Sequence, residues 1–583
     1  MKDFIPLLPY LKRYKKKLMW GFICVIFYIL FFTLLPYIVG NAIDELQHNP
    51  DSSVLFKYFC ISVGTVLIGS VFLFFTRRTI IVASREIEND LRHDFFEHIE
   101  TLPRNFYNTT TTGNLMALAT NDLNAIRNFV GPGIMYTMQT TFRTIVTVTV
   151  LLYISPMLTL FALLPLPIIT YLVFKIGRLT HQRSLRVQES FADVTTRTQE
   201  NISGIRIIKS FVREDREIEK FKILSKEYFK KNLSLAKVQS FSFPMMQLLT
   251  GISIIIVIYF GGMKVISGEL TYGDITKFVM YLGSLTWPMI AMGWIINLIQ
   301  RAAPSMNRIN EIIKIIPDIR DDNNTDLKIR SEDIEGEIEF KNVSFKYHGT
   351  EKYILKNFNL KINKGTTLGI VGLTGTGKTT LINLLPRVYD ISEGEILIDG
   401  INIKKIPLNI LRNSIGIVPQ DSFLFSTTIE KNISYSKDYI DYDEIVSAAR
   451  SASLYKDVDD FPNKFQTVVG ERGITLSGGQ KQRTSLARAI YKKPKVLILD
   501  DSLSAVDTHT EEEILGELKK IMADRTSIII SHRISSIQNA NNIIVISGSV
   551  IKEEGTHNEL LVQGGIYFDL YQKQLLEEEI VNE

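Results

Sequence analysis

Long apolar runs recur within the first 320 residues of the chain and are missing from the remainder. Each run approaches or exceeds the roughly 20 residues that an α-helix needs to cross a bilayer. A single run of this kind could be a buried core helix, but six of them in one half of a chain indicate a membrane domain. We therefore expect six spanning helices, at about residues 18–40, 55–76, 133–154, 157–177, 244–266 and 276–299.

The positions of lysine and arginine predict the orientation of these spans, because cytoplasmic loops carry an excess of both. Five basic residues lie within positions 12–17, just before the first span, whereas the next turn, residues 41–54, has none. The N-terminus is therefore expected in the cytoplasm. The connections 77–132 and 178–243 are long, rich in Arg and Lys, and helical in pattern, so the helices are expected to project into the cytoplasm as long rods.

The pattern changes after Arg308, where the apolar runs shorten. Residues 318–333 are polar and indicate a linker. From Gly336 onward, short β-rich runs alternate with polar helical segments, which favours an α/β domain with a largely parallel sheet. The runs expected to be strands are IEFKNVSF, TTLGIVG, EILIDG, IGIVPQ, KVLILDD, TSIIISH and NIIVISG.

Composition and charge exclude several classes of protein. With 583 residues, 45% hydrophobic and 22% charged, the chain is neither disordered nor collagen-like. It has only two cysteines, Cys24 and Cys60, both in apolar runs, so we expect unpaired packing residues and no disulfide scaffold. The net charge of +4 is too small to indicate a nucleic-acid partner.

A phosphate-binding loop gives the strongest chemical signal. It follows the strand LGIV, opens the apolar-periodic helix LINLL, and matches G-x-x-x-x-G-K-[ST]. In such loops, backbone N–H groups converge on phosphate oxygens, the lysine reaches the β- and γ-phosphates, and the following hydroxyl binds Mg²⁺. The residues expected to bind nucleotide here are Gly372, Leu373, Thr374, Gly375, Thr376, Gly377, Lys378, Thr379 and Thr380.

Two further segments extend this signal. The apolar strand VLIL ends at Asp500, about 120 residues after the loop, where a carboxylate can hold the Mg²⁺ shell. Between them lies a glycine-containing turn before the helix TSLARAI, made of Leu476 and then Ser477, Gly478, Gly479 and Gln480. The P-loop, this LSGGQ segment and the Asp500 strand together resemble the ATP-binding cassette (ABC) ATPase domain.

The resemblance assigns roles to further residues. Gln420 matches the Q-loop, which lies near Mg²⁺, His532 matches the switch histidine, and Tyr347 takes the place of the aromatic residue that stacks on adenine. Residues 502–507 look like the D-loop. Residues 471–473 resemble the x-loop of exporters. The implied cofactors are ATP and Mg²⁺.

The resemblance covers the whole chain, because six spans followed by one ATPase domain is the layout of bacterial multidrug and lipid ABC half-transporters. It implies an elbow helix at 1–17 on the inner membrane surface, a transmembrane domain at 18–315, a linker at 316–335 and a nucleotide-binding domain at 336–583. It also implies coupling helices near 106–113 and 199–206 that rest on the ATPase domains. The expected fold is thus a six-helix membrane domain fused to an α/β P-loop ABC domain.

In this family two ATPase domains pair head to tail, so each ATP lies between the P-loop of one chain and the LSGGQ segment of the other. The family pattern has a catalytic Glu after the Asp500 position, but this chain has Asp501. Its carboxylate falls about 1 Å short, an error that can cost on the order of 10²-fold in rate. We favour a heterodimer whose partner carries the Glu. In the alternative, Asp501 works slowly in a homodimer.

Ionisable, polar and aromatic residues inside the expected spans are the candidates for a substrate path. Arg143 is the clearest ionisable residue inside a span, and an intramembrane Arg is a candidate functional residue. An ordinary structural pairing remains equally open. Gln139, Trp287 and Trp294 are weaker candidates for the substrate path. We expect ATP-driven export of amphipathic drugs or lipids across the bacterial inner or plasma membrane. The alternative is a homodimeric exporter of lipid or peptide, or a siderophore transporter on the same scaffold.

Overall fold

Two compact units make up the chain. The first, which we call the helical unit, comprises Met1–Glu100 and Thr112–Ile315, and the second, the P-loop unit, comprises Thr101–Thr111 and Ile316–Glu583. This computed structural model describes residues 2–470, 473, 475–503 and 508–582.

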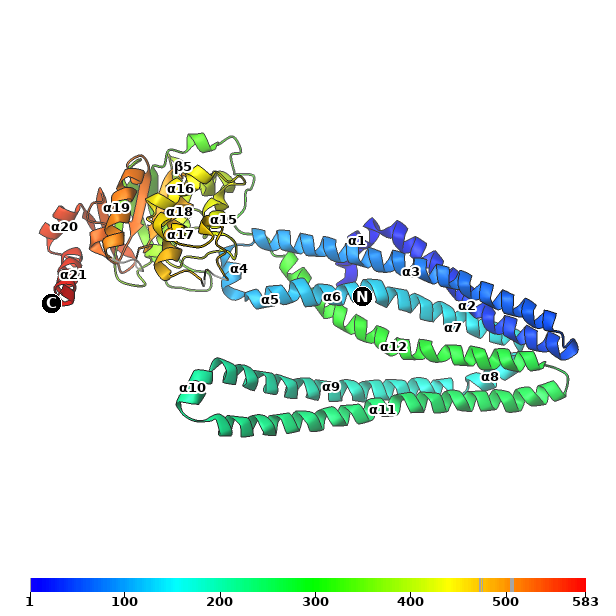
Figure 1. The fold of residues 1–583 in the computed structure, drawn as a ribbon. Coiled ribbons are helices and arrows are strands. Elements are labelled where there is room, and N and C mark those ends of the chain that lie inside the picture. Colours follow the sequence, from blue (N-terminus) through cyan, green and yellow to red (C-terminus); the bar gives the residue numbers. More distant parts are fainter. Residues whose placement is uncertain (1, 471–472, 474, 504–507, 583) are drawn as a thin grey trace. The chain divides into compact units, whose positions relative to one another are not determined.

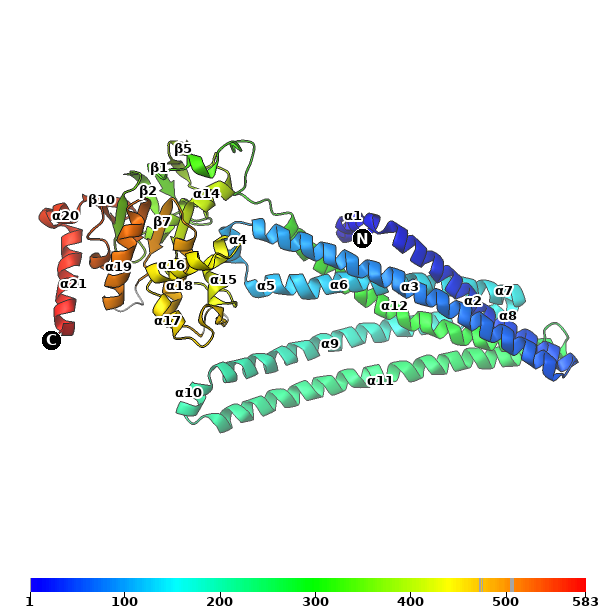
Figure 2. The ribbon, with the colours of Figure 1, turned by 45° about the horizontal axis from the view of Figure 1, so that its top comes forward.

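The helical unit consists of long helices and a few short helical turns. Figures 1 and 2 show α9 and α11 side by side, joined by α10. At 1.5 Å per residue the 50 residues of α3 span about 75 Å, far more than a bilayer core of roughly 30 Å, so α3 must extend well beyond the membrane. The elements are η1 (Lys2–Leu7), α1 (Leu8–Arg13), α2 (Lys15–His48), α3 (Ser52–Thr101), α5 (Thr112–Ala117), η2 (Leu118–Asp122), α6 (Leu123–Asn128), η3 (Phe129–Gly133), α7 (Ile134–Ile154), α8 (Pro156–Leu163), α9 (Leu166–Ser203), α10 (Ile205–Ser210), α11 (Glu214–Ile266) and α12 (Tyr272–Ile313).

Three helices of the described part of the chain are long and apolar enough to cross a membrane, namely α2, α3 and α12. A shorter apolar segment, Thr250–Ile266, ends α11. The other expected spans fall in α7 and across α8 and α9. A helical membrane domain is therefore present, and the number of six spans stays a prediction.

The expected single helix over residues 157–177 is wrong in detail, because α8 ends at Leu163 and α9 begins at Leu166. Pro165 lies between them and has no N–H to donate to the preceding turn, which explains the break. Ser155 caps the start of α8, where its hydroxyl accepts a hydrogen bond from the backbone N–H of Leu158 at 3.4 Å.

The start of the chain is fixed to α3 by polar contacts. Residues 15–17 already belong to α2, so the helical segment before it is shorter than the expected elbow helix. The contacts form a ladder in which Tyr10 pairs with Asp94 at 2.5 Å, Arg13 with Asp90 at 2.6 Å and Lys17 with Glu86 at 2.6 Å. The placement of this segment on a membrane surface stays a prediction.

One short helix overlaps the first expected coupling position, and another begins at the end of the second. The helix α4 (Arg104–Thr109) follows the end of α3 and overlaps the expected 106–113. The second, α10, begins after Gly204 and so lies mostly beyond the expected 199–206, because the Gly-containing break ends α9 and the new helix starts only after it. Residues 101–111, which contain α4, belong to the P-loop unit.

The P-loop unit contains two sheets. A four-stranded antiparallel sheet has the order β2-β1-β4-β5, and a six-stranded sheet has the order β10-β9-β3-β8-β7-β6, in which only β10 is antiparallel. The strands are β1 (Ile338–Phe345), β2 (Leu355–Ile362), β3 (Thr367–Val371), β4 (Glu393–Ile398), β5 (Ile401–Asn402), β6 (Ile415–Val418), β7 (Val496–Asp500), β8 (Thr526–Ile530), β9 (Asn542–Ser547) and β10 (Val550–Gly555).

All seven strands expected from the sequence are confirmed, and β2, β5 and β10 were missed. Buried side chains of both sheets, such as Phe340, Ile370 and Ile498, form one core between them. The helices of this unit are α4, α13 (Lys378–Leu384), α14 (Leu408–Ser414), α15 (Ile429–Ile433), α16 (Tyr442–Ser451), α17 (Tyr455–Asp459), α18 (Gly478–Tyr491), α19 (Thr508–Met522), α20 (His557–Gln563) and α21 (Ile566–Asn582), with short helical turns η4 (Ser331–Asp333), η5 (Ser434–Ser436), η6 (Lys464–Gln466) and η8 (Ile534–Ser536).

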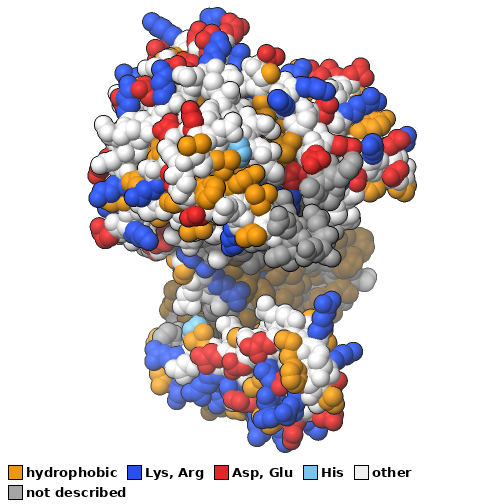
Figure 3. Space-filling model, turned by 90° about the vertical axis from the view of Figure 1, so that its left-hand side faces the viewer, with side chains coloured by type: hydrophobic (Ala, Val, Ile, Leu, Met, Phe, Trp, Pro, Cys, Tyr) orange, Lys and Arg blue, Asp and Glu red, His pale blue; other side chains and the backbone are white. Residues whose placement is uncertain are grey.

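The linker packs on the P-loop unit through its backbone and side chains. The Asp321 carboxylate accepts a hydrogen bond from the N–H of Leu408 at 2.9 Å, and the N–H of Asp326 donates to the Lys405 carbonyl at 2.8 Å. On the face of this unit in Figure 3, acidic and basic side chains are interspersed with small hydrophobic patches.

Candidate nucleotide-binding site

The P-loop connects the end of β3 to the start of α13. Gly375 and Gly377 have φ values of +83° and +98°, in the left-handed region that glycine adopts without strain. A side chain at Gly377 would also lie 2.8 Å from Ile354. The Lys378 ammonium donates to the carbonyls of Gly372 at 2.6 Å and Leu373 at 3.0 Å, so it lies folded over the loop. Burial lowers the pKa of Lys378.

Two consecutive carboxylates face this loop. Asp500 is the last residue of β7, is 3% exposed, and accepts a hydrogen bond from the Thr379 hydroxyl. Burial raises the pKa of Asp500, and the neighbouring charge of Asp501 raises it further. Asp501 has a φ of +46°, and its N–H donates to the Ile530 carbonyl at 2.8 Å. The left-handed backbone turns the chain sharply directly after the strand.

A cavity of about 300 Å³ brings most of the expected site residues together. Three residues of the loop do not line it, namely Gly372, Leu373 and Thr376. The carbonyls of the first two accept hydrogen bonds from Lys378, and the Thr376 hydroxyl donates to the Leu373 carbonyl. The lining consists of Tyr347, Ile354, Thr374, Gly375, Gly377, Lys378, Thr379, Thr380, Gln420, Asp500, Asp501, Ile530 and His532. Side chains from five separate segments thus converge on one space, as a nucleotide site requires.

Tyr347, which lines the cavity, belongs to an aromatic cluster. The Tyr347 hydroxyl is 2.8 Å from the Thr380 hydroxyl, and its ring packs edge-on against Phe345 and Tyr389. The Asn108 amide, on α4, donates to the Tyr389 hydroxyl at 3.2 Å. The short helix that interrupts the membrane helices therefore contacts the cluster that contains Tyr347. Sequence reasoning missed Tyr389, and no motif marks it.

A second group of residues that sequence reasoning missed holds the loop after β8. The Gln574 side-chain amide, on α21, donates to the His532 carbonyl at 2.5 Å and accepts from the N–H of Ile534 at 2.9 Å. From the other side, the buried Glu511 carboxylate of α19 pairs with Arg533 and accepts from the Ser536 hydroxyl. These contacts fix the backbone at His532 and in the residues that follow it directly.

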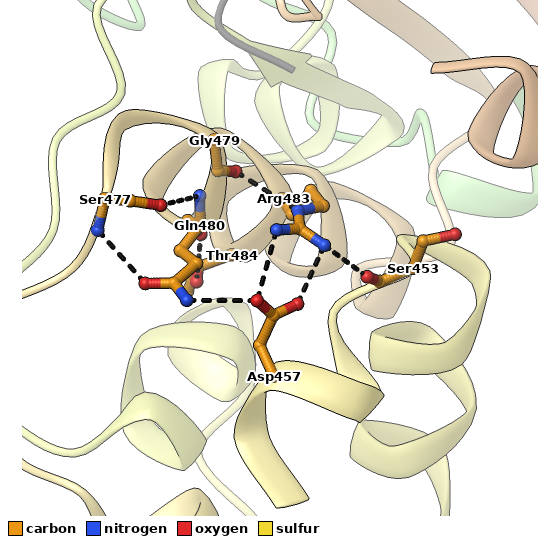
Figure 4. A network of polar contacts seen from close by, with 7 residues as sticks. All are labelled: Ser453, Asp457, Ser477, Gly479, Gln480, Arg483 and Thr484. Carbon is orange, nitrogen blue, oxygen red and sulfur yellow. Dashed lines mark hydrogen bonds and ion pairs between the residues drawn. The ribbon is translucent and has the colours of Figure 1, made fainter. Parts of the chain in front are cut away.

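The LSGGQ segment forms the start of α18. Ser477 caps the helix, with its hydroxyl accepting from the N–H of Gln480 and the Gln480 side chain accepting from the N–H of Ser477, a reciprocal capping box. Figure 4 shows Asp457 beneath this turn, in contact with Gln480 at 3.0 Å and with Arg483 at 2.8 Å. The turn is rigidly held, with Gly478 and Gly479 at the helix start.

No residue of the signature segment lies among the described residues that line the P-loop cavity. Within one chain the two halves of the expected site are therefore separate. Part of the D-loop (residues 504–507) and part of the x-loop (471–472) lie outside the described residues. Gly473 has a φ of +71°.

The residues present fit ATP and a magnesium ion. The buried Lys378 ammonium and the glycine-rich backbone suit phosphate oxygens, and the Thr379 hydroxyl beside the Asp500 carboxylate offers the hard oxygen ligands that Mg²⁺ prefers. Among the described residues no three His, Cys, Asp or Glu side chains gather as a metal cage. NTPase magnesium sites need none, since phosphates and water complete the shell.

The candidate residues of the membrane helices are only partly brought together. Arg143, Gln139 and Trp287 line one cavity of about 170 Å³ in the helical unit. Trp294 does not line that cavity and packs edge-on against Tyr136, with ring centroids 5.2 Å apart.

Known protein families match both parts of the chain. Residues 18–289 match the family "ABC transporter transmembrane region", and residues 355–504 match the family "ABC transporter". The chain belongs to the ABC transporters, and it combines a helical transmembrane domain with an ABC ATPase that is coupled to transport.

Its relatives cover nearly the whole chain. A probable multidrug resistance ABC transporter ATP-binding/permease protein, YheI of Bacillus subtilis, is 37% identical over 93% of this chain and 92% of its own length. An ATP-dependent lipid A-core flippase of Syntrophus aciditrophicus is 35% identical over 94% and 90%. The structure of a bacterial Atm1-family ABC exporter with ATP bound superimposes with a TM-score of 0.79 at 25% identity, over 96% of this chain and 99% of that one.

Proposed function

We propose that this chain exports amphipathic drugs or lipids by ATP-driven alternating access between inward- and outward-facing states. The names of the relatives support this direction and substrate range. The observation that carries the proposal is the contact of Asn108, on a helix that interrupts the membrane helices, with Tyr389 beside the nucleotide cavity. A change at the nucleotide then has a physical path to the membrane helices.

The same proposal assigns roles in the cavity. Tyr347 stacks on adenine, Lys378 and the P-loop hold phosphates, and Thr379, Gln420 and Asp500 hold Mg²⁺, which when bound neutralises charge on the transferred phosphoryl group. Asp501 stands at the position of the base, and His532 contacts the γ-phosphate. Ser477, Gly478, Gly479 and Gln480 serve the ATP of the partner chain, in keeping with their separation from this cavity.

The partner is, in this proposal, a different half-transporter with a Glu at the catalytic position. Asp501 carries one methylene fewer than Glu, so from the same backbone its carboxylate stops about 1 Å short, and such an error costs on the order of 10²-fold in rate. The site on this chain's own P-loop is then degenerate, and the intact signature segment completes the competent site. A homodimer with a slow Asp501 base is the second candidate.

The protein lies, in this proposal, in the inner or plasma membrane of a bacterium, with its N-terminus and ATPase domain in the cytoplasm and membrane lipids around its helices. Lys and Arg near the start of α2 support this orientation.

The test is ATPase activity in proteoliposomes that contain this chain with a candidate partner half-transporter. The proposal expects amphipathic drugs or lipids to stimulate hydrolysis and to move across the membrane. Stimulation by peptides or siderophores alone would instead support the alternative substrates.

A further inference from the structure

A positive charge without a matching negative one lies in the expected membrane spans. These spans, as bounded above, contain no Asp or Glu, yet Arg143 lies near the middle of one of them, on α7. A charged side chain in the bilayer is costly and is usually paired or used in function. The contacts of Arg143 therefore decide whether it has only a structural role.

In the described part of the chain, the Arg143 guanidinium contacts aromatic residues of α2. It donates to the Tyr28 hydroxyl at 3.3 Å and lies 4.3 Å from the centroid of the Phe32 ring. No carboxylate of the described chain lies within ion-pair distance of Arg143 or of Arg77. Aromatic contacts hold the guanidinium in place but leave its charge uncompensated.

Other hydrogen-bond donors line the same cavity of about 170 Å³. Arg77, from α3, is a second guanidinium, and the Gln139 amide nitrogen is buried without a hydrogen-bond partner in the described structure. A buried donor without a partner costs free energy that a ligand oxygen can recover. Two guanidinium groups and an amide N–H together suit the oxygens of a phosphate or carboxylate.

A larger and mostly apolar cavity adjoins this one. It has a volume of about 630 Å³ and shares Arg77 and Tyr136 with the smaller cavity. Apolar side chains such as Phe74, Val82 and Met135 line it. The donor-lined cavity can therefore take a headgroup while the apolar one takes the adjoining part of a hydrocarbon chain.

A cationic headgroup fits these surroundings poorly. Aromatic rings attract cations, but Arg143 already lies over Phe32 and close to Tyr28. Two guanidinium groups that line a small space repel a further positive charge, and the repulsion is strong where water is scarce. Charge thus selects against cationic amphiphiles.

We propose that the cavity formed by Arg143, Arg77 and Gln139 binds the anionic headgroup, phosphate or carboxylate, of an amphipathic substrate. This rests on the proposed export function and narrows its substrate class.

The experiment measures binding of fluorescent alkyl phosphate, alkyl carboxylate and alkyl trimethylammonium probes of equal chain length to the assembled transporter in neutral detergent. The two anionic probes should bind more tightly than the cation. Arg143→Gln should weaken them roughly 10- to 100-fold and remove the preference, and Arg143→Lys should weaken them less. The matched control is Arg85→Gln, on α3 but outside both cavities, which should leave binding unchanged.

Three outcomes overturn the inference: equal or tighter binding of the cation, anion binding that Arg143→Gln leaves intact, or inorganic phosphate competing as well as the amphiphile does. ATPase stimulation by the same probes separates this inference from the export proposal. Stimulation without preference for anions refutes only the inference. Tight anion binding with no stimulation or transport by any amphiphile refutes export and keeps the site.

Discussion

At the scale of single residues, the Tyr347 ring and the Asp500 carboxylate both line the nucleotide cavity, and each gives a prediction about nucleotide binding. The P-loop string and the strand before Asp500 were readable from the sequence because each motif is local. Tyr389 and Gln574 were not, since their partners Asn108 and His532 lie 281 and 42 residues away and only the fold brings them together. Contacts between distant segments leave no periodic trace in a single sequence.

Tyr347→Ala should weaken ATP binding by roughly 1–3 kcal/mol, the usual value of base–aromatic stacking. Tyr347→Phe keeps the ring and loses only the hydroxyl contact with Thr380, so it should have a much smaller effect. Fluorescent-nucleotide titration of the purified transporter measures both. Equal affinity in the wild type and both variants would show that Tyr347 does not stack on the base.

Asp500 predicts a pH effect on magnesium-dependent binding. Because burial raises the pKa of this carboxyl, Asp500 takes up a proton at a higher pH than an ordinary Asp, and the protonated form is a poor Mg²⁺ ligand. The increase in ATP affinity that Mg²⁺ gives should therefore fall on acidification before the usual Asp pKa of about 3.9 is reached.

The matched variant for this pH effect is Asp500→Asn. In this variant Mg²⁺ should increase the affinity for ATP only slightly at every pH. The difference between the wild type and the variant is measured by nucleotide titration with and without Mg²⁺. A difference that stays constant from neutral pH down to about 4 would show that Asp500 is not the titrating ligand.

At the scale of elements, alternation and apolar runs gave the seven strands of the α/β domain. Strand β2 was missed because its exposed face is polar and interrupts the apolar pattern, with buried residues only at Leu355, Phe358, Leu360 and Ile362. The break between α8 and α9 was missed because Leu164 and Pro165 lie inside a continuous apolar run. A hydropathy average over many residues hardly changes at one proline, whereas the missing N–H of that proline interrupts the hydrogen bonds of the helix.

The hydrogen bonds from α21 to the loop after β8 give a prediction at this scale. Gln574→Ala removes the acceptor for the Ile534 N–H, so exchange of that amide should speed up roughly fivefold, as expected for the loss of about 1 kcal/mol. Gln574→Glu keeps an acceptor for the N–H and should retain most of the protection. Hydrogen-exchange mass spectrometry of the full transporter measures both variants. Unchanged protection in the alanine variant would show that Gln574 does not hold the loop after β8.

At the scale of the whole molecule, the six expected spans outnumber the described helices that qualify as spans by length and hydropathy. The apolar runs fixed the number of spans only as an expectation, because length and composition alone qualify just α2, α3 and α12 among the described helices. Arg143 and several Thr residues lower the hydropathy of α7, and prolines divide the α8–α9 region. Polar residues that serve packing or function weaken the signal that marks a span.

Reporter fusions test the topology directly. A reporter near Asp44 should be extracellular, and reporters near Asn121 and Lys222 should be cytoplasmic, because Lys and Arg concentrate in the long connections. A reporter at Lys222 on the outside would contradict the arrangement of six spans.

The central claim is the unequal pair of ATP sites, and ATP turnover of the two-chain transporter with single substitutions in this chain tests it most directly. Asp501→Asn alters only the site that is already slow and should reduce ATP turnover by less than about twofold. Ser477→Ala alters the competent site and should reduce ATP turnover on the order of 10²-fold. The chain purified alone should hydrolyse ATP poorly. Vigorous ATPase activity of this chain alone, abolished by Asp501→Asn, would contradict the account and show Asp501 to be a working base in a homodimer.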